Sequence, residues 1–244
     1  MFNYFRVALV MAATALLPSL AKAQATELFF SEYIEGSASN KAIEIFNGTG
    51  APVNLATYSV RIFSNGSATP TGSVTLTGTL ASGDVFVICN SASIAGILGV
   101  CDLQNNTVAN FNGDDALDLR NGSTVLDVFG QIGFGTNWGT APDSTLNTTL
   151  VRDSVVCQGD TNGSNAFDPG PEWTGSAQDT TANLGSHSAS CSAAVPTLSI
   201  ATTASVAEGN TGCAGGTTAL NFTVTSSSPA ASNINFTFTT ADGT

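Results

Sequence analysis

Residues 116–129 read ALDLRNGSTVLDVF, and this stretch decides the fold class. Apolar and polar residues alternate on both sides of Asn121-Gly122, and a period of two is typical of β-strands. Asn-Gly suits a type I′ turn, because both central residues of that turn need positive φ. The stretch therefore predicts a β-hairpin with Asn121 and Gly122 at its turn. Asp118 and Asp127 are expected on the solvated face of its strands.

The same kind of pattern recurs along the chain. Asn47-Gly48 and Asn65-Gly66 supply turns, and no stretch has the sustained period of an amphipathic helix. Many short strands between Gly-rich and Asn-rich turns predict an all-β sandwich. Residues 131–147 show little periodicity, and we expect a long loop or an irregular edge there. Residues 160–190 are rich in Gly, Asp, Asn and Ser, and we expect an extended loop or tail held by Cys157 and Cys191. The further candidate strands are residues 26–34, 41–47, 58–64, 73–80, 84–89 and 149–156.

The N-terminus has the layout of a secretory signal peptide. Residues 1–6 carry a positive charge, residues 7–17 are apolar, and Ala21-Lys22-Ala23 offers small residues around a cleavage position. The apolar run is shorter than the roughly 20 residues that span a bilayer. We expect cleavage after Ala23, with Ala25 as the alternative, and a secreted protein without a membrane span, in the medium or on the outer surface of the cell.

The charge of the chain argues against nucleic-acid binding. Eighteen Asp and Glu residues stand against six Lys and Arg, and removal of residues 1–23 leaves four basic residues and a formal charge of −14. Nucleic-acid affinity comes mostly from Lys and Arg that neutralise phosphates. An acidic surface is instead compatible with solubility and with weak cation binding.

Five cysteines follow the signal peptide, and in an oxidising compartment they are expected to form disulfides. No C-x-x-C pair is present and the chain has one histidine, which disfavours a zinc site. We expect Cys89–Cys101 and Cys157–Cys191, because each pair brackets a loop within one predicted domain. Cys213 is then left over.

The composition changes after the last predicted disulfide. Residues 192–197 have the character of a linker, and a new strand pattern begins at residue 198. Two or three strands cannot bury a two-sheet core. We therefore expect residues 198–244 to be an incomplete second domain, and the chain to be the N-terminal part of a longer protein.

Three blocks of sequence stand out: SEYIEG at 31–36 with NKAIEIFN at 40–47, NGDDALDL at 112–119 with VLDVFG at 125–130, and residues 152–157 with 168–173. Together they resemble the lamin tail domain of bacterial proteins. The resemblance covers residues 25–191 and implies an immunoglobulin-like β-sandwich. Secreted bacterial proteins that begin with this domain often carry an endonuclease/exonuclease/phosphatase-type nuclease further along.

Residues 198–244 resemble the first half of a Calx-β domain, through Leu198-Ser199-Ile200, SVAEG at 205–209, FTVT at 222–225 and TADGT at 240–244. The resemblance implies a second β-sandwich, truncated here, and in some members of that family a calcium site. Glu208 and Asp242 fall where such domains place acidic ligands, so they are the candidate metal ligands, with calcium as the candidate ion and no other cofactor.

Other side chains offer weaker candidates for chemistry. His187 is the single histidine and is expected in a loop near the second disulfide, whereas a nuclease of the type just named uses two histidines. The alternative interpretation of Asp114-Asp115 and of the hairpin residues Asp118 and Asp127 is that their carboxylates form a site for a hard cation. Residues 160–165 partly match a calcium loop but lack its terminal Glu. Trp138 and Trp173 are expected to be packing residues, with ligand stacking as the alternative.

These observations leave three hypotheses. We expect a non-catalytic extracellular binding or spacer module, whose partner is a downstream domain of the same chain or an extracellular surface. The alternatives are the front end of a secreted nuclease whose catalytic domain lies beyond residue 244, and a calcium-dependent surface adhesin.

Overall fold

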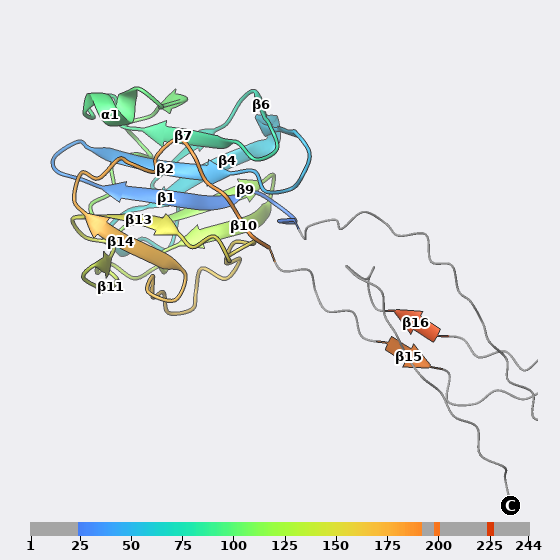
Figure 1. The fold of residues 1–244 in the computed structure, drawn as a ribbon. Helices are drawn as coiled ribbons and strands as arrows, with labels where there is room; N and C mark the ends of the chain where they lie inside the picture. Colours follow the sequence, from blue (N-terminus) through green and yellow to red (C-terminus); the bar gives the residue numbers. More distant parts are fainter. Residues whose placement is uncertain (1–23, 192–197, 201–223, 227–244) are drawn as a thin grey trace, which may run out of the picture. The chain divides into compact units, whose positions relative to one another are not determined.

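The computed structural model describes residues 24–191, 198–200 and 224–226 (Figure 1). Residues 24–191 belong to one compact unit. No helix among the described residues is long and apolar enough to cross a membrane. Several sequence predictions lie outside the described residues: the signal peptide with Ala23, the 192–197 linker, Glu208, Cys213 and Asp242.

Two antiparallel sheets form the body of residues 24–191, and the predicted all-β sandwich is confirmed. The first sheet has the order β14-β13-β1-β2-β7-β8, with β8 parallel to β7, and the second has the order β10-β9-β4-β5. The first contains β1 (Phe29–Glu35), β2 (Lys41–Phe46), β7 (Val85–Cys89), β8 (Leu103–Gln104), β13 (Thr148–Arg152) and β14 (Trp173–Ala177). The second contains β4 (Tyr58–Phe63), β5 (Gly72–Thr75), β9 (Ala116–Asn121) and β10 (Thr124–Phe129).

Short elements complete the fold. The pair β11–β12 lies within the predicted 131–147 loop, and β14 lies within the predicted 160–190 loop. The pair β15–β16 lies in the region with the Calx-β resemblance. The short elements are β3 (Val53–Asn54) with β6 (Thr79–Leu80), β11 (Gly139–Thr140) with β12 (Asp143–Ser144), β15 (Leu198–Ile200) with β16 (Val224–Ser226), α1 (Ala95–Leu98), and 3-10 turns at Leu55–Thr57 and Ser64–Gly66.

The main core lies between the two sheets. Tyr33 of β1 is fully buried, and its ring stacks on Phe111 and Phe129 with centroids 4.5 and 4.3 Å away. Burial of each large apolar side chain contributes roughly 1.5–3 kcal/mol. The alternation of the strands supplies the other contributors, among them Phe30, Ile43 and Ile45 from the first sheet and Val60, Ile62, Leu117 and Leu119 from the second.

The outer face of the first sheet is also covered, by residues 178–191, which we call the strap. Leu184 of the strap packs with Ile34 and Ala42. The strap's His187 ring lies edge-on to Phe46, with centroids 4.9 Å apart. Figure 1 shows the strap, in orange, crossing β1 and β2. Every residue of these two strands is therefore buried, although the sequence alternates.

Two disulfides close the loops that the cysteine spacing indicated. The sulfur atoms of Cys89 and Cys101 are 2.08 Å apart, and those of Cys157 and Cys191 are 2.09 Å apart. The second bond fixes the end of the strap to the chain just after β13. Each closed loop is expected to stabilise the fold by about 2–4 kcal/mol.

The predicted hairpin is present, but its turn differs from the prediction. Asn121 pairs with Thr124, so Gly122 and Ser123 are the two loop residues. Gly122 has a φ of 58°, whereas Asn121 does not have positive φ. The type I′ assignment to Asn121-Gly122 was therefore wrong by one residue, because Asn121 still belongs to the ladder.

Both hairpin carboxylates are fully buried, which corrects the expectation of a solvated face. Asp118 lies beside Arg61 and Arg120, which donate to its oxygens from β4 and β9. A bulge after Val125 makes Asp127 the register partner of Leu119, a core residue. The bulge thus places Asp127 on the inner side of its strand.

Asp127 connects the two sheets. Its Oδ2 accepts hydrogen bonds from Arg152 Nη1 of β13 at 2.9 Å and from the backbone N of Phe30 in β1 at 2.8 Å. Its Oδ1 accepts from the backbone N of Asp160 at 2.8 Å. The Arg152 guanidinium lies 4.9 Å from the Trp173 ring centroid and also donates to Glu172. One buried ion pair therefore holds β10 against β1 and β13.

We predict that Asp127→Asn lowers the free energy of unfolding by about 3–5 kcal/mol, because it leaves the Arg152 charge without its buried partner. Urea denaturation measures the change. Glu172→Gln is the control: Glu172 contacts the same arginine but its side chain is 48% exposed, so we expect a loss below about 1 kcal/mol. Equal losses in the two variants would contradict the assignment.

Candidate functional site

Three of the four acidic residues considered for a hairpin metal site, Asp115, Asp118 and Asp127, are used by the fold itself. Asp115 accepts from the backbone N of Asn65 at 2.7 Å and of Asn112 at 3.1 Å, which ties two loops together. Asp118 and Asp127 are paired with arginines. Among the residues that the structure describes, no group of three or more His, Cys, Asp or Glu side chains could hold a metal.

The partial calcium loop at residues 160–165 is closed by its own hydrogen bonds. Asp160 Oδ1 accepts from the backbone N of Asn162 at 2.8 Å, and Asn162 Oδ1 accepts from the Ser164 hydroxyl at 2.7 Å. The backbone of Asp160 in turn bonds to Asp127. These contacts give the segment a structural role, in which it buries the sheet-joining carboxylate.

The two tryptophans are packing residues. Trp138 and Trp173 are 5% and 2% exposed. Trp173 meets the Phe129 ring edge-on at 5.2 Å, and Trp138 meets the Phe167 ring edge-on at 5.9 Å. Neither ring therefore offers an open face for stacking on a ligand.

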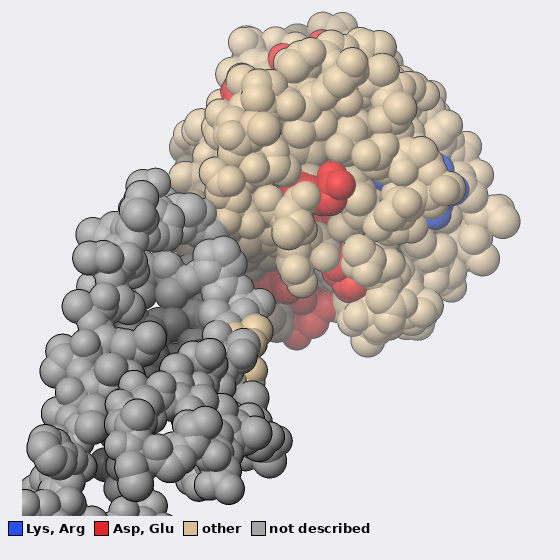
Figure 2. Space-filling view, turned by 90° about the vertical axis from the view of Figure 1, so that its right-hand side faces the viewer, with Lys and Arg blue, Asp and Glu red and all other residues tan. Residues whose placement is uncertain are grey.

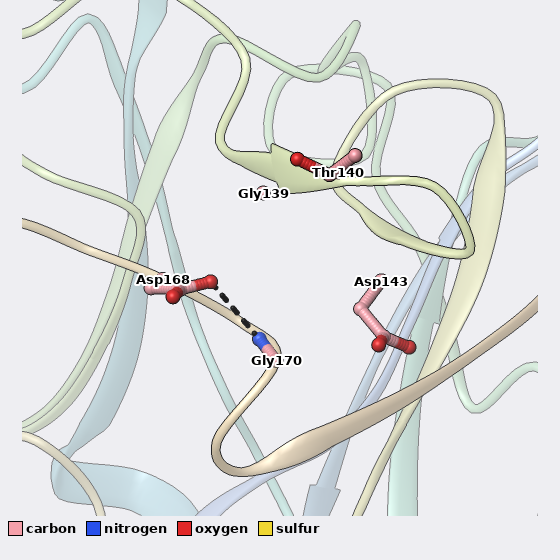
Figure 3. A pocket seen from close by; sticks show the side chains of 5 residues that line it. All are labelled: Gly139, Thr140, Asp143, Asp168 and Gly170. Atoms are coloured by element: carbon pink, nitrogen blue, oxygen red, sulfur yellow. Dashed lines mark hydrogen bonds between the residues drawn. The ribbon is translucent and has the colours of Figure 1, made fainter.

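A surface cavity of about 470 Å³ lies beside β11 and β12, and Figure 3 shows its lining residues. Two carboxylates reach it, and each is engaged by the backbone. Asp143 accepts from the N of Gly175 at 2.7 Å, and Asp168 accepts from the N of Gly170 at 3.2 Å. The lining residues are Gly139, Thr140, Asp143, Asp168 and Gly170.

A pair of buried carboxyl groups lies beneath the strap. Glu32 of β1 is the register partner of Glu44 of β2, so the two side chains share the outer face of the first sheet. Glu44 accepts from the Ser31 hydroxyl at 2.6 Å and from the backbone N of Gly185 in the strap at 2.7 Å. Glu32 is 1% exposed, and neither of its carboxyl oxygens has a hydrogen-bond partner.

A second cavity, of about 370 Å³, lies between β13 and the strap. Val151 lines it and is also the register partner of Glu32, so Glu32 lies between Glu44 and the β13 wall of this cavity. The Nε2 atom of His187, another lining residue, is also buried without a partner. The lining residues are Val151, Arg152, Ser154, Asn183, Ser186, His187 and Ser188.

Burial controls the protonation of this site. It raises the pKa of Glu32 to about 8, and the nearby Glu44 carboxylate adds to the rise. Burial also raises the pKa of Glu44, although Ser31 and the strap backbone oppose the rise. It lowers the pKa of His187 to about 4, with a further contribution from the charge of Arg152. At neutral pH Glu32 therefore holds a proton and His187 is a neutral imidazole.

Sequence reasoning missed this pair. Glu32 stands inside the apolar run FFSEYIE, and an acidic residue there was the available signal. Alternation placed Glu44 on the same side as Ala42 and Phe46 but did not show that this side is covered. His187 lies in a loop near the second disulfide, as expected, and its ring packs on Phe46 of β2.

Comparison with known proteins supports part of the family resemblance. The model of the lamin tail domain family matches residues 21–133. The match includes the first two blocks of the resemblance and stops before residues 152–157 and 168–173. These segments adjoin β13 and β14, which extend the first sheet. No curated protein and no solved structure matches the chain.

We predict that the stability advantage of Glu32→Gln over wild type grows as pH rises from about 5 to about 8. In that range the folded chain keeps a proton on Glu32 that the unfolded chain releases, so wild type loses stability with rising pH. The loss is on the order of 4 kcal/mol at most, and the neutral amide does not incur it. Denaturation at several pH values measures it, with the exposed Asp168→Asn as control; a pH-independent difference would refute the assignment.

Proposed function

We propose that this chain works as a non-catalytic binding or spacer module outside the cytoplasm. The observation that carries the proposal is the lamin tail domain match on a two-sheet sandwich, because that family is an immunoglobulin-like, non-enzymatic domain. The two disulfides and the signal-peptide layout of residues 1–23 support export to an oxidising compartment.

Two of the four edges of the main sheets, β10 and β14, suit a module that must remain in solution beside other chains. On the β10 edge, the backbone N of Val128 donates to the carbonyl of Asp160 at 2.7 Å. On the β14 edge, the backbone N of Gly175 donates to Asp143. Edge groups that are already bonded do not recruit a strand from another chain. This arrangement supports a spacer that positions its neighbours without aggregating.

The surface charge limits the partners. Figure 2 shows a face that is mostly uncharged, with separate groups of acidic residues and few basic atoms. Of the four basic residues that follow the signal peptide, Lys41 and Arg152 are buried and Arg61 and Arg120 are paired with Asp118. We infer that the partner is a neighbouring domain or an extracellular surface that tolerates negative charge, and that nucleic acid is not bound directly.

We predict that the full chain, expressed in a bacterial host, is exported and begins at Gln24 after processing. Mass spectrometry of the non-reduced protein should show the Cys89–Cys101 and Cys157–Cys191 peptides. A variant without residues 1–23 is the control for export and should stay in the cytoplasm. Export of that control would contradict the proposal.

The purified protein should not hydrolyse DNA in the presence of magnesium or calcium. Hydrolysis of DNA would contradict the proposal that the chain is non-catalytic.

A further inference from the structure

One buried carboxyl group among the described residues lacks any donor. The other buried acidic residues all have donors: Glu35 from Lys41 and the backbone of Asn147, Glu44 from Ser31 and Gly185, Asp115 from two backbone amides, and Asp118 and Asp127 from arginines. Glu32 alone has none. A buried carboxylate is costly unless it is protonated, paired or bound to a metal. The position of Glu32 therefore requires a proton or a cation.

We propose that Glu32 and Glu44 form a binding site for a hard divalent cation, Ca²⁺ or Mg²⁺. Directly opposed residues on antiparallel strands have Cβ atoms about 4.5–5.5 Å apart, so the two carboxyl groups are within reach of one ion. Their combined charge of two matches that of a divalent ion, whereas one proton neutralises only half of it.

The oxygen atoms around the pair suit such an ion. Both Glu32 oxygens are free, and each Glu44 oxygen that accepts one hydrogen bond keeps a second lone pair. The Ser31 hydroxyl lies beside Glu44 and adds a neutral oxygen. Hard cations take oxygen ligands, and Mg²⁺ commonly uses one or two carboxylates together with water. The adjoining 370 Å³ cavity has room for that water.

The surrounding charges also favour a cation. Asp102 adds a further negative charge near Glu44. The strap contains no Lys or Arg that could compete for the site. The nearest arginine, Arg152, is committed to Asp127 and Glu172, and His187 is neutral. The cavity between β13 and the strap, whose Ser154, Ser186 and Ser188 are polar, lies on the Val151 side of Glu32.

Isothermal titration calorimetry of the full chain with CaCl₂, and separately with MgCl₂, tests the proposal. We expect one ion bound per chain. The ion with the smaller dissociation constant is the one that the site prefers.

Variants locate the site. Glu32→Gln should abolish binding, whereas Asp143→Asn and Asp168→Asn, in the other acidic cavity, should leave it unchanged. Glu208→Gln with Asp242→Asn tests the residues suggested by the Calx-β resemblance and should also leave it unchanged. If Glu32→Gln does not fold, Glu44→Gln, which removes the other carboxylate of the pair, decides in its place and should also abolish binding. Absence of binding at about 10 mM ion, which exceeds the weakest protein calcium sites, overturns the proposal, as does binding that survives the loss of either carboxylate. None of these outcomes depends on export, so the proposal stands or falls separately from the proposed function.

Discussion

The sandwich depends on the buried ion pair between Asp127 and Arg152. The two residues come from different sheets, and the same carboxylate accepts from the backbone of Phe30 on a third strand. A buried pair adds little net stability compared with a hydrophobic pair of similar size, but loss of one partner leaves an uncompensated charge. The pair therefore acts as a constraint on how the sheets can be assembled. A register in which Asp127 faced outward would leave Arg152 buried without its partner.

Backbone donors allow an acidic protein with few basic residues to bury a carboxylate such as Asp115. Asp115 and the partly exposed Asp179 accept mainly from backbone N–H groups and short polar side chains, and each joins segments far apart in sequence. Hydrogen bonds to a carboxylate favour its charged form, and the contacts with Ser37 and Asn40 accordingly lower the pKa of Asp179. The acidic composition thus contributes to internal connections as well as to the surface.

The strands and the hairpin could be predicted from the sequence because their signals are local, and the disulfide pairs because each closes a short loop. The burial of Asp118 could not, since it depends on Arg61, 57 residues away on β4. The burial of Asp127 depends on a bulge that the alternating pattern conceals. Glu32 was missed for the same kind of reason, because the strap that covers it lies about 150 residues later in the chain.

Glu32 also connects the charge of the site to the position of the strap. The strap is held at one end by Cys191 and at the other by Asp179, and between them the backbone of Gly185 donates to Glu44. With a proton or a cation on the pair, the strap covers a site whose charge is reduced or neutral. Without either, it would cover two adjacent carboxylates, whose burial and mutual repulsion favour exposure to water. A docked strap therefore requires that the pair be neutralised, and whichever species neutralises it also stabilises the cover over β1 and β2.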